Sequence, residues 1–301
     1  MTYGVIDMGS NTIRLCLYRL ERGELISLFN KKTTAGLIGY VNKGELDSKG
    51  IKKACDVLNE YKKMLEFANV KELYVFATAS LRNISNSSEA VRRIYEETGL
   101  QVDVLSGYDE AVLDFEGACH GEKLHEGIMV DIGGGSTEIL YFHGGEVKDA
   151  VSLDIGSLSM YRDYVGRLFP KKSEAEAIRR KVECELDKVT FLDGKSFEVM
   201  IGIGGTIRAV KKFNNDILGL PGGNSIIRTE GLERMLNELR DEKKQTLNKV
   251  LRVAPDRIHT LIPGMLILHT IFRRYSCREI HMSSFGVREG YLYRKIEVKE
   301  K

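Results

Sequence analysis

The sequence predicts an α/β protein made of two copies of one domain, and three observations support this prediction. The same strand–turn–strand unit occurs twice, once around Asp7 and again around Asp131. Strand and helix patterns alternate along most of the chain, which is typical of α/β sheets. Glycine-rich turns follow three of the expected strands. Two such domains, each presenting an Asp-x-Gly turn, are expected to face one another across a cleft.

The duplication is visible at an offset of 124 residues, which separates Asp7 from Asp131. At this offset Gly9 corresponds to Gly133 and Thr12 to Ser136. An internal repeat of this length indicates two similar structural units. The apolar positions of the following strand also correspond: Leu15 with Ile139, Leu17 with Tyr141, and Tyr18 with Phe142.

The first half of the chain predicts a sheet with helices packed against it. Apolar positions at helical spacing predict helices from Ser48 to Phe67 and from Ser88 to Thr98. A further helix is expected to begin at Ser106, with the acidic pair Asp109-Glu110 in its first turn. Short apolar runs predict strands at residues 3–6, 13–18, 25–29, 73–77 and 101–105.

The second half also predicts alternating strands and helices. Ser173 to Glu176 reads as a capping box, and Asp256 to Tyr275 as one long apolar helix that Pro263 allows to kink. Strands are expected at residues 127–130, 139–142, 197–201 and 279–282. The expected domains are residues 1–122, joined by a C-terminal helix at 287–301, and residues 123–286, with a hinge at 121–127.

The stretch from Val130 to Glu138 carries the clearest chemical signal. An apolar run delivers Asp131 into three consecutive glycines, whose backbone N–H groups can approach a phosphate closely. A carboxylate at the end of a buried strand is costly unless a charge or a hydrogen bond meets it, and a divalent metal would do so. The alternative is a glycine-rich hairpin with a capping Asp, and Glu110 likewise has an alternative as a helix N-terminal charge.

Composition narrows the functional classes. The 301 residues include 45 basic and 43 acidic side chains, a net charge of +2 that argues against a general nucleic-acid coat. Five widely spaced cysteines without a Cys-x-x-Cys pair predict reduced thiols and a cytoplasmic protein. There is no signal-peptide pattern and no apolar run of the ~18 residues that a membrane span needs, so no membrane partner is expected.

Six motifs in order along the chain resemble those of the exopolyphosphatase/guanosine pentaphosphate phosphohydrolase family. They cover nearly the whole chain, and those at 77–83, at 130–138 and at the end are characteristic of this family. The resemblance implies the actin-like, sugar-kinase-like ATPase superfold, with two ribonuclease-H-like domains in the short, two-domain form. The matching stretches are residues 6–11, 77–83, 106–111, 130–138, 202–208 and 285–293.

The resemblance implies a Mg²⁺-dependent exopolyphosphatase that releases terminal orthophosphate from inorganic polyphosphate by water attack. Glu110 is expected to act as the general base, with Asp7, Asp131 and Glu138 as metal-site acids. The expected substrate-binding residues are Ser10, Asn11, Arg82, Gly133, Gly134, Gly135, Ser136, Gly204, Gly205, Thr206 and Arg208.

The sequence also departs from the family pattern. Val112 stands where the family often has Arg, Ser284 where it often has Asp, and the segment from Arg257 to His259 lacks an Asp that is often present. These changes are expected to thin the charged shell around the chemical centre. Basic clusters that could form a polyphosphate track, or equally a solvated surface, occur at residues 31–32, 179–181, 211–212 and 273–274.

Three alternatives to the exopolyphosphatase hypothesis remain. One is a guanosine pentaphosphate 5′-phosphohydrolase, and another is a polyphosphate-dependent phosphotransferase of the same superfold. The third is a non-enzymatic sensor of polyphosphate or alarmone, against which the presence of Glu110 argues. No nucleic-acid partner is expected, and the sequence leaves a homodimer open as an assembly.

Overall fold

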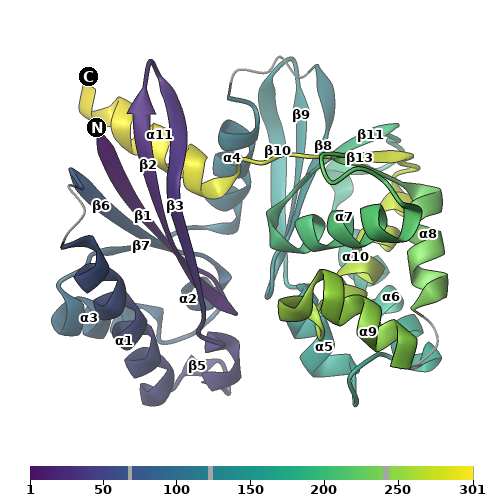
Figure 1. The fold of residues 1–301 in the computed structure, drawn as a ribbon, viewed down its shortest axis with the longest axis horizontal. Helices are drawn as coiled ribbons and strands as arrows, with labels where there is room; N and C mark the ends of the chain where they lie inside the picture. Colours follow the sequence, from purple (N-terminus) through teal and green to yellow (C-terminus); the bar gives the residue numbers. More distant parts are fainter. Residues whose placement is uncertain (67–69, 121–124, 240–243, 301) are drawn as a thin grey trace. The chain divides into compact units, whose positions relative to one another are not determined.

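The computed structural model describes residues 1–66, 70–120, 125–239 and 244–300. The chain divides into two compact units (Figure 1). Unit 1 comprises residues 1–110 and 291–301, and unit 2 comprises residues 111–290. The units therefore divide between residues 110 and 111 and between residues 290 and 291, whereas the sequence predicts divisions between residues 122 and 123 and between residues 286 and 287. Residues 121–124 of the expected hinge lie outside the described residues.

Unit 1 contains a five-stranded sheet in the order β3-β2-β1-β6-β7. β1, β2 and β3 pair antiparallel, whereas β6 and β7 continue the sheet in parallel from β1. The strands are β1 (Thr2–Met8), β2 (Thr12–Glu21), β3 (Glu24–Thr34), β6 (Glu72–Ala77) and β7 (Val102–Val104). The remaining elements that begin in this unit are η1 (Leu37–Tyr40), β4 (Val41–Asn42), β5 (Glu45–Leu46), α1 (Ser48–Leu65), α2 (Ala79–Arg82), α3 (Ser87–Thr98) and α4 (Gly107–Ala118).

Unit 2 contains a six-stranded sheet in the order β10-β9-β8-β11-β13-β12. Its strands are β8 (Glu126–Ile132), β9 (Thr137–His143), β10 (Glu146–Leu153), β11 (Val199–Ile203), β12 (Ile226–Arg228) and β13 (Glu279–Met282). Its helices are α5 (Ser157–Tyr164), α6 (Lys172–Leu186), η2 (Thr190–Leu192), α7 (Gly204–Leu218), α8 (Thr229–Glu238), α9 (Lys244–Val253), η3 (Pro255–Arg257) and α10 (Leu261–Arg274), followed by α11 (Val287–Glu300).

Alternation along β8 explains how the sheet of unit 2 is buried on both faces. Ile128, Val130 and Ile132 belong to the larger core, which α7 and α10 cover. Met129 points to the opposite face and packs in a smaller core with Phe115 of α4. Helices therefore cover both faces of β8. Because both faces are buried, the sequence of this strand is nearly continuously apolar.

The structure confirms the predicted α/β duplication. In each unit three antiparallel strands are followed by two parallel strands in the same spatial order, and unit 2 adds β12 as an antiparallel edge strand. The first turn also closes in the same way, because Gly9 N–H donates to the Thr12 carbonyl at 3.0 Å and Gly133 N–H to that of Ser136 at 2.9 Å. The two Asp-x-Gly turns are thus closed by equivalent backbone hydrogen bonds.

Two local predictions were wrong. α6 begins at Lys172, and the backbone N–H of Lys171 donates to Glu174 at 2.8 Å, so Glu174 rather than Glu176 makes the capping contact. α10 begins at Leu261, because residues 255–257 form a separate 3₁₀ turn. Pro263 therefore lies in the first turn of the helix, where a missing N–H breaks no helical hydrogen bond and no kink is required. Strand β12 and helix α9 were not predicted.

Helix α11 begins in unit 2 and ends in unit 1, where it covers the face of the sheet opposite α1 and α3 (Figure 1). Tyr291 packs on Phe76 with ring centroids 4.8 Å apart. Asp103 accepts hydrogen bonds from the Tyr291 hydroxyl at 2.6 Å and from Lys295 at 2.8 Å. Burial opposes ionisation of Asp103, but these two bonds outweigh it and hold the pKa of the carboxyl below its usual 3.8.

We expect Asp103→Asn to lower the free energy of unfolding at neutral pH. The neutral amide loses the charge that Lys295 pairs with in unit 1. Because the pKa of Asp103 is lowered in the folded state, its stabilisation is present above pH 3.8 and is lost as the pH falls below that value. Denaturant unfolding should therefore separate the two proteins at neutral pH and bring them together in acid. A constant difference at every pH would contradict this assignment.

Two helices cross at glycines near the division between the units. A Cβ at Gly117 of α4 would lie 2.2 Å from the carbonyl oxygen of Gly286, and one at Gly290 of α11 would lie 1.9 Å from that of Leu113. Asp114 also accepts a hydrogen bond from the Val287 N–H at 2.7 Å. The backbones of the two helices are therefore in direct contact, which only residues without a side chain allow.

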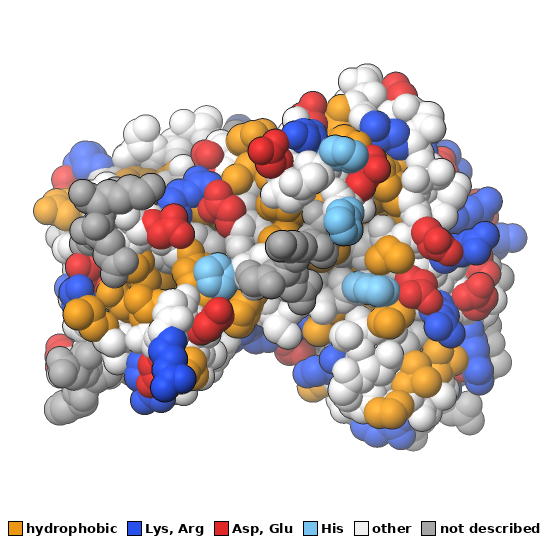
Figure 2. Space-filling view, turned by 90° about the horizontal axis from the view of Figure 1, so that it is seen from above, with side chains coloured by type: hydrophobic (Ala, Val, Ile, Leu, Met, Phe, Trp, Pro, Cys, Tyr) orange, Lys and Arg blue, Asp and Glu red, His pale blue; other side chains and the backbone are white. Residues whose placement is uncertain are grey.

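Within the described ranges, no helix combines the length and apolarity required to cross a membrane. Figure 2 shows one face of the protein, on which acidic and basic side chains are interspersed. This mixed surface agrees with the small net charge of +2.

Candidate active site

The main carboxylate pair of unit 2 stands at the end of β8 and the start of β9. Asp131 is directly opposite Glu138 in the antiparallel register. Side chains at such positions lie on one face with Cβ atoms ~5 Å apart, and like charges there are destabilising. Glu138 is only 3% exposed and accepts a hydrogen bond from Ser152 at 2.7 Å. Two carboxylates placed in this way favour a bound cation.

The glycine turn at residues 133–136 is hydrogen-bonded to the start of α5. The backbone N–H of Ser157 donates to the Gly133 carbonyl and that of Leu158 to the Gly134 carbonyl, both at 2.9 Å. A Cβ at Gly156 would lie 2.4 Å from the Gly134 carbonyl group. The start of α5 therefore occupies acceptors of the turn, a contact that the sequence analysis did not identify.

The third glycine turn lies beside this carboxylate pair. β11 runs parallel to β8 with Ile203 opposite Asp131, and α7 begins at the next residue, Gly204. A Cβ at Gly204 would lie 1.9 Å from Asp131 Oδ1, and its φ of +87° also requires glycine. The N-terminus of α7 therefore meets the Asp131 carboxylate directly. Helix N-termini favour anions, so this turn suits a phosphate group.

Arg257 is a further residue at the third turn. Its Nη2 atom lies 2.3 Å from the position that a Cβ would take on Gly205. A guanidinium is unfavourable at the positive end of a helix dipole unless an anion completes the arrangement. Arg257 therefore places a cation beside the third turn. Arg257 was not among the predicted site residues, because it stands 52 residues after Gly205 and no local pattern links the two.

The corresponding turn of unit 1 has a different charge. Asp7 is opposite Arg14, whereas its counterpart Asp131 is opposite Glu138. The carbonyl of Ser10 accepts from the Ile38 N–H at 3.0 Å, and that of Asn11 accepts from the Gly36 N–H at 2.8 Å. Backbone donors thus bind the carbonyls of both turns. The paired carboxylates, however, occur only in the turn of unit 2.

Glu110 and Arg82 form a close ion pair in unit 1. Arg82 Nη1 lies 2.5 Å from Glu110 Oε2, and their side chains are 16% and 10% exposed. Arg82 closes α2, directly after β6, and Glu110 lies in the first turn of α4. The Ser106 hydroxyl begins that turn by accepting the Asp109 N–H at 3.0 Å. A neighbouring guanidinium favours the ionised form of a carboxylate, which is the form that a general base requires.

The structure distributes the predicted residues between the two units. Unit 1 holds Asp7, Ser10, Asn11, Arg82 and Glu110. Unit 2 holds Asp131, the turn at 133–136, Glu138, the turn at 204–206, and half-buried Arg208 on α7. The described residues contain no cluster of three or more side chains suited to a metal. The Asp131–Glu138 pair nevertheless fits Mg²⁺, which commonly takes one or two carboxylates and completes its shell with water and phosphate oxygens.

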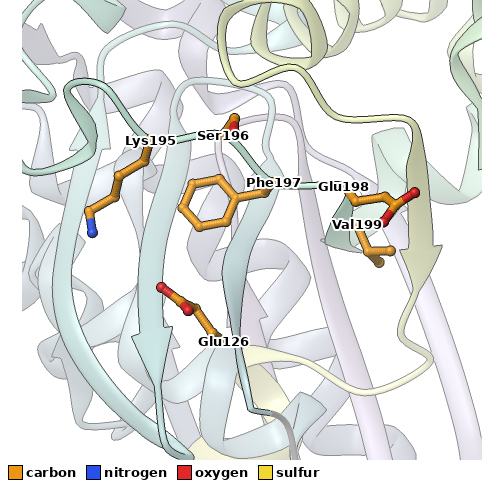
Figure 3. A pocket seen from close by; sticks show the side chains of 6 residues that line it. All are labelled: Glu126, Lys195, Ser196, Phe197, Glu198 and Val199. Atoms are coloured by element: carbon orange, nitrogen blue, oxygen red, sulfur yellow. The ribbon is translucent and has the colours of Figure 1, made fainter.

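A separate cavity of about 410 Å³ lies at the other ends of β8 and β11, lined by Glu126 and by residues 195–199 (Figure 3). Lys195 lies over the ring of Tyr141, 4.4 Å from its centroid, and the Tyr141 hydroxyl donates to Glu126 at 2.6 Å. Asp131 and Gly204 stand at the opposite ends of these strands. This cavity is therefore distinct from the glycine turns.

Comparison with known proteins gives one consistent family. A sequence model of the Ppx/GppA phosphatase family matches residues 17–299. Exopolyphosphatase 1 of Mycobacterium tuberculosis is 25% identical over 99% of this chain and 89% of its own length. The guanosine-5′-triphosphate,3′-diphosphate pyrophosphatase of Photobacterium profundum is 24% identical over 97% of this chain and 58% of its own length.

Solved structures give the same fold. An exopolyphosphatase from Cytophaga hutchinsonii superposes with a TM-score of 0.87 and 21% identity, covering 99% of this chain and 98% of its own. The Ppx/GppA family member from Aquifex aeolicus has a TM-score of 0.81 and 24% identity, covering 100% and 99%. At these identities the likeness establishes the two-domain, actin-like architecture.

Proposed function

Because this chain belongs to the Ppx/GppA phosphatase family, we propose that it is a hydrolase of phosphoric anhydride bonds that releases terminal orthophosphate from inorganic polyphosphate. One observation carries the proposal: Asp131 lies between a second carboxylate, Glu138, and the N-terminus of α7. Carboxylates for a cation and backbone donors for an anion are thereby placed side by side. A metal-bound phosphoryl group requires this combination.

In the proposed reaction Glu110 accepts a proton from the attacking water. A bond forms between the water oxygen and the terminal phosphorus, and the bond from that phosphorus to the bridging oxygen breaks. The shortened chain leaves with the electron pair of the broken bond. Arg82, 2.5 Å from Glu110, fixes the orientation of the carboxylate. The turn at 133–136 and the start of α7 would bind the phosphate oxygens.

Asp131 and Glu138 would hold Mg²⁺, and Asp7 belongs to the other unit, where it stands opposite Arg14. The metal would supply charge neutralisation to the phosphate oxygens. Arg257 and Arg208 would add positive charge beside the third turn. We therefore propose Asp131 and Glu138, rather than Asp7, as the principal metal-binding carboxylates.

Hydrolysis of guanosine pentaphosphate is the second candidate activity. It is supported by the relative from Photobacterium profundum, which is named for a guanosine substrate. Both substrates end in a phosphoric anhydride, so the same turns could bind either terminal group. A steady-state comparison of short polyphosphate, long polyphosphate and guanosine pentaphosphate would rank them.

Orthophosphate release from polyphosphate, measured with and without ADP, tests the reaction class. Hydrolysis predicts free orthophosphate in both conditions. Appearance of phosphate only in ATP would replace the hydrolase proposal with a phosphotransferase. Binding of polyphosphate without release in either condition would replace it with a sensor.

We expect Asp131→Asn and Glu138→Gln each to raise the Mg²⁺ concentration for half-maximal activity by at least about tenfold, because even loss of an outer partner of a metal costs that much. Direct binding of Mn²⁺, used as a paramagnetic probe, should weaken in parallel. Asp149→Asn is the matched control, since its carboxylate is exposed on β10 and accepts the N–H of the adjacent Ala150 at 2.9 Å. Unchanged metal dependence in both variants would remove the pair from the metal site.

A further inference from the structure

A second cavity in unit 2 contains an unusual set of charged side chains. It has a volume of about 350 Å³ and lies where α6 and α8 flank α10. Its lining consists of Arg179, Glu233, Leu236, Asn237, His269 and Arg273. None of these residues belongs to the glycine turns or to the Glu110–Arg82 pair. The volume is at the small end of the range for ligand pockets, ~300–1,000 Å³.

Arginines from two different helices bring positive charge to this cavity. Arg179 is half-buried on α6, and Arg273 is exposed near the end of α10. Within the described part of the chain, no carboxylate forms an ion pair with Arg273, whereas its neighbour Arg274 pairs with Asp187 at 2.9 Å. These two arginines belong to two of the basic clusters that the sequence analysis noted. The fold brings them together although they are 94 residues apart.

His269 lies on the wall between them. Its side chain is only 9% exposed, and its Nε2 atom is 3.7 Å from a carboxylate oxygen of Glu233 on α8. Its Nδ1 atom is buried and has no hydrogen-bond partner among the residues that the structure describes. Burial, first, and the nearby Arg179 and Arg273 lower the pKa of this histidine, and Glu233 only partly opposes them. At neutral pH the lining therefore carries two positive charges from arginine and one negative charge from Glu233.

We propose that this cavity binds a tetrahedral oxyanion of the phosphate type. Two guanidiniums supply charge-assisted donors, for which phosphate oxygens are well-matched acceptors. The Asn237 amide can supply a neutral donor from α8. The size of the cavity suits a single phosphate group, free or at the end of a larger molecule, together with a few waters.

Glu233 gives the proposed site a preference for hydrogen phosphate over sulfate. An ionised carboxylate only accepts hydrogen bonds. Hydrogen phosphate carries one P–OH group that can donate to Glu233, whereas sulfate has no proton and would meet the carboxylate by repulsion. The two anions have the same charge and nearly the same size, so the part of their affinity difference that Glu233→Gln removes reports this contact.

The test follows the His269 imidazole by NMR while inorganic phosphate is added to the intact protein, with the signal assigned by a His269→Asn variant. We expect a saturable shift and a raised pKa for His269, since a bound dianion stabilises imidazolium. Arg273→Gln and Arg179→Gln should each weaken binding by about tenfold or more, the usual effect of losing a hydrogen bond to a charged group. Arg274→Gln is the matched control and should bind normally.

Further comparisons in the same experiment identify the ligand. Sulfate should bind more weakly than phosphate, and Glu233→Gln should reduce that difference. Phosphoserine and pyrophosphate, compared with orthophosphate, distinguish an attached phosphate group from the free ion. A signal that does not shift saturably, or that shifts equally in the wild type and in both cavity arginine variants, would overturn the proposal. Because the measurement is made at His269, its outcome is independent of whether the protein hydrolyses polyphosphate.

Discussion

Glu110→Gln is expected to lower the turnover of polyphosphate by about 10²–10⁴-fold, the usual contribution of a positioned general base. The amide has nearly the same shape and can still contact Arg82, which lies 2.5 Å from the native carboxylate. It cannot accept a proton from water. Polyphosphate binding, measured by calorimetry, should therefore stay within a few-fold of the wild type. Single-turnover release of orthophosphate would show whether the chemical step is the one that is lost.

Asp109→Asn is the matched control for this variant. Asp109 is adjacent in the same first turn of α4, and its N–H is capped by Ser106. If Glu110 only stabilised the helix N-terminus, both variants would lose similar, small amounts of stability and neither would lose turnover. Comparable activity of the two variants would therefore support the structural role of Glu110 and remove it from the mechanism.

Gly290→Ala is expected to destabilise the protein by at least about 3 kcal/mol, the upper end of what overpacking usually costs. The added Cβ would lie 1.9 Å from the carbonyl oxygen of Leu113 and 3.0 Å from the amide nitrogen of Gly117. Both contacts are with helix backbone, which cannot rotate away as a side chain can. Denaturant unfolding followed by circular dichroism should show an earlier transition.

Gly231→Ala provides the comparison for this effect. It lies in helix α8, where the nearest atoms to the added Cβ are side-chain atoms, Asn214 Oδ1 at 2.5 Å and Leu218 Cδ1 at 3.2 Å. Side chains can move where backbone cannot, and alanine favours a helix over glycine by about 1 kcal/mol, so a small net change is expected. If Gly290→Ala were as mild as Gly231→Ala, the contact between the backbones of α4 and α11 would not be a tight constraint.

The duplication could be predicted from sequence because both copies keep a local pattern. Strand, Asp-x-Gly turn and strand are encoded within about a dozen neighbouring residues around Asp7 and Asp131, and the backbone bonds that close both turns agree. The offset also aligns Arg14 with Glu138. This difference in charge indicates which copy is better suited to a metal, and it becomes meaningful once the register places Arg14 opposite Asp7 and Glu138 opposite Asp131.

Other features depend on contacts that local patterns do not encode. Arg257 reaches Gly205 from a 3₁₀ turn far along the chain, and Gly117 meets Gly290 across two helices. No periodicity in either segment specifies such a partner. The capping-box prediction was wrong for a local reason. Glu174 and Glu176 are both candidates, and the structure begins the helix two residues earlier than Ser173 alone suggested.

The division of the chain between the units has a consequence for the order of folding during synthesis. Unit 2 is one continuous segment, residues 111–290, whereas unit 1 needs residues 291–301 in addition to residues 1–110. Tyr291 and Lys295 can reach Asp103 only after all of unit 2 has been synthesised. Domains usually fold from the N-terminus as they emerge. Unit 1 therefore begins to be synthesised before unit 2 but is completed after it. Until α11 has been made, one face of the unit 1 sheet lacks its covering helix.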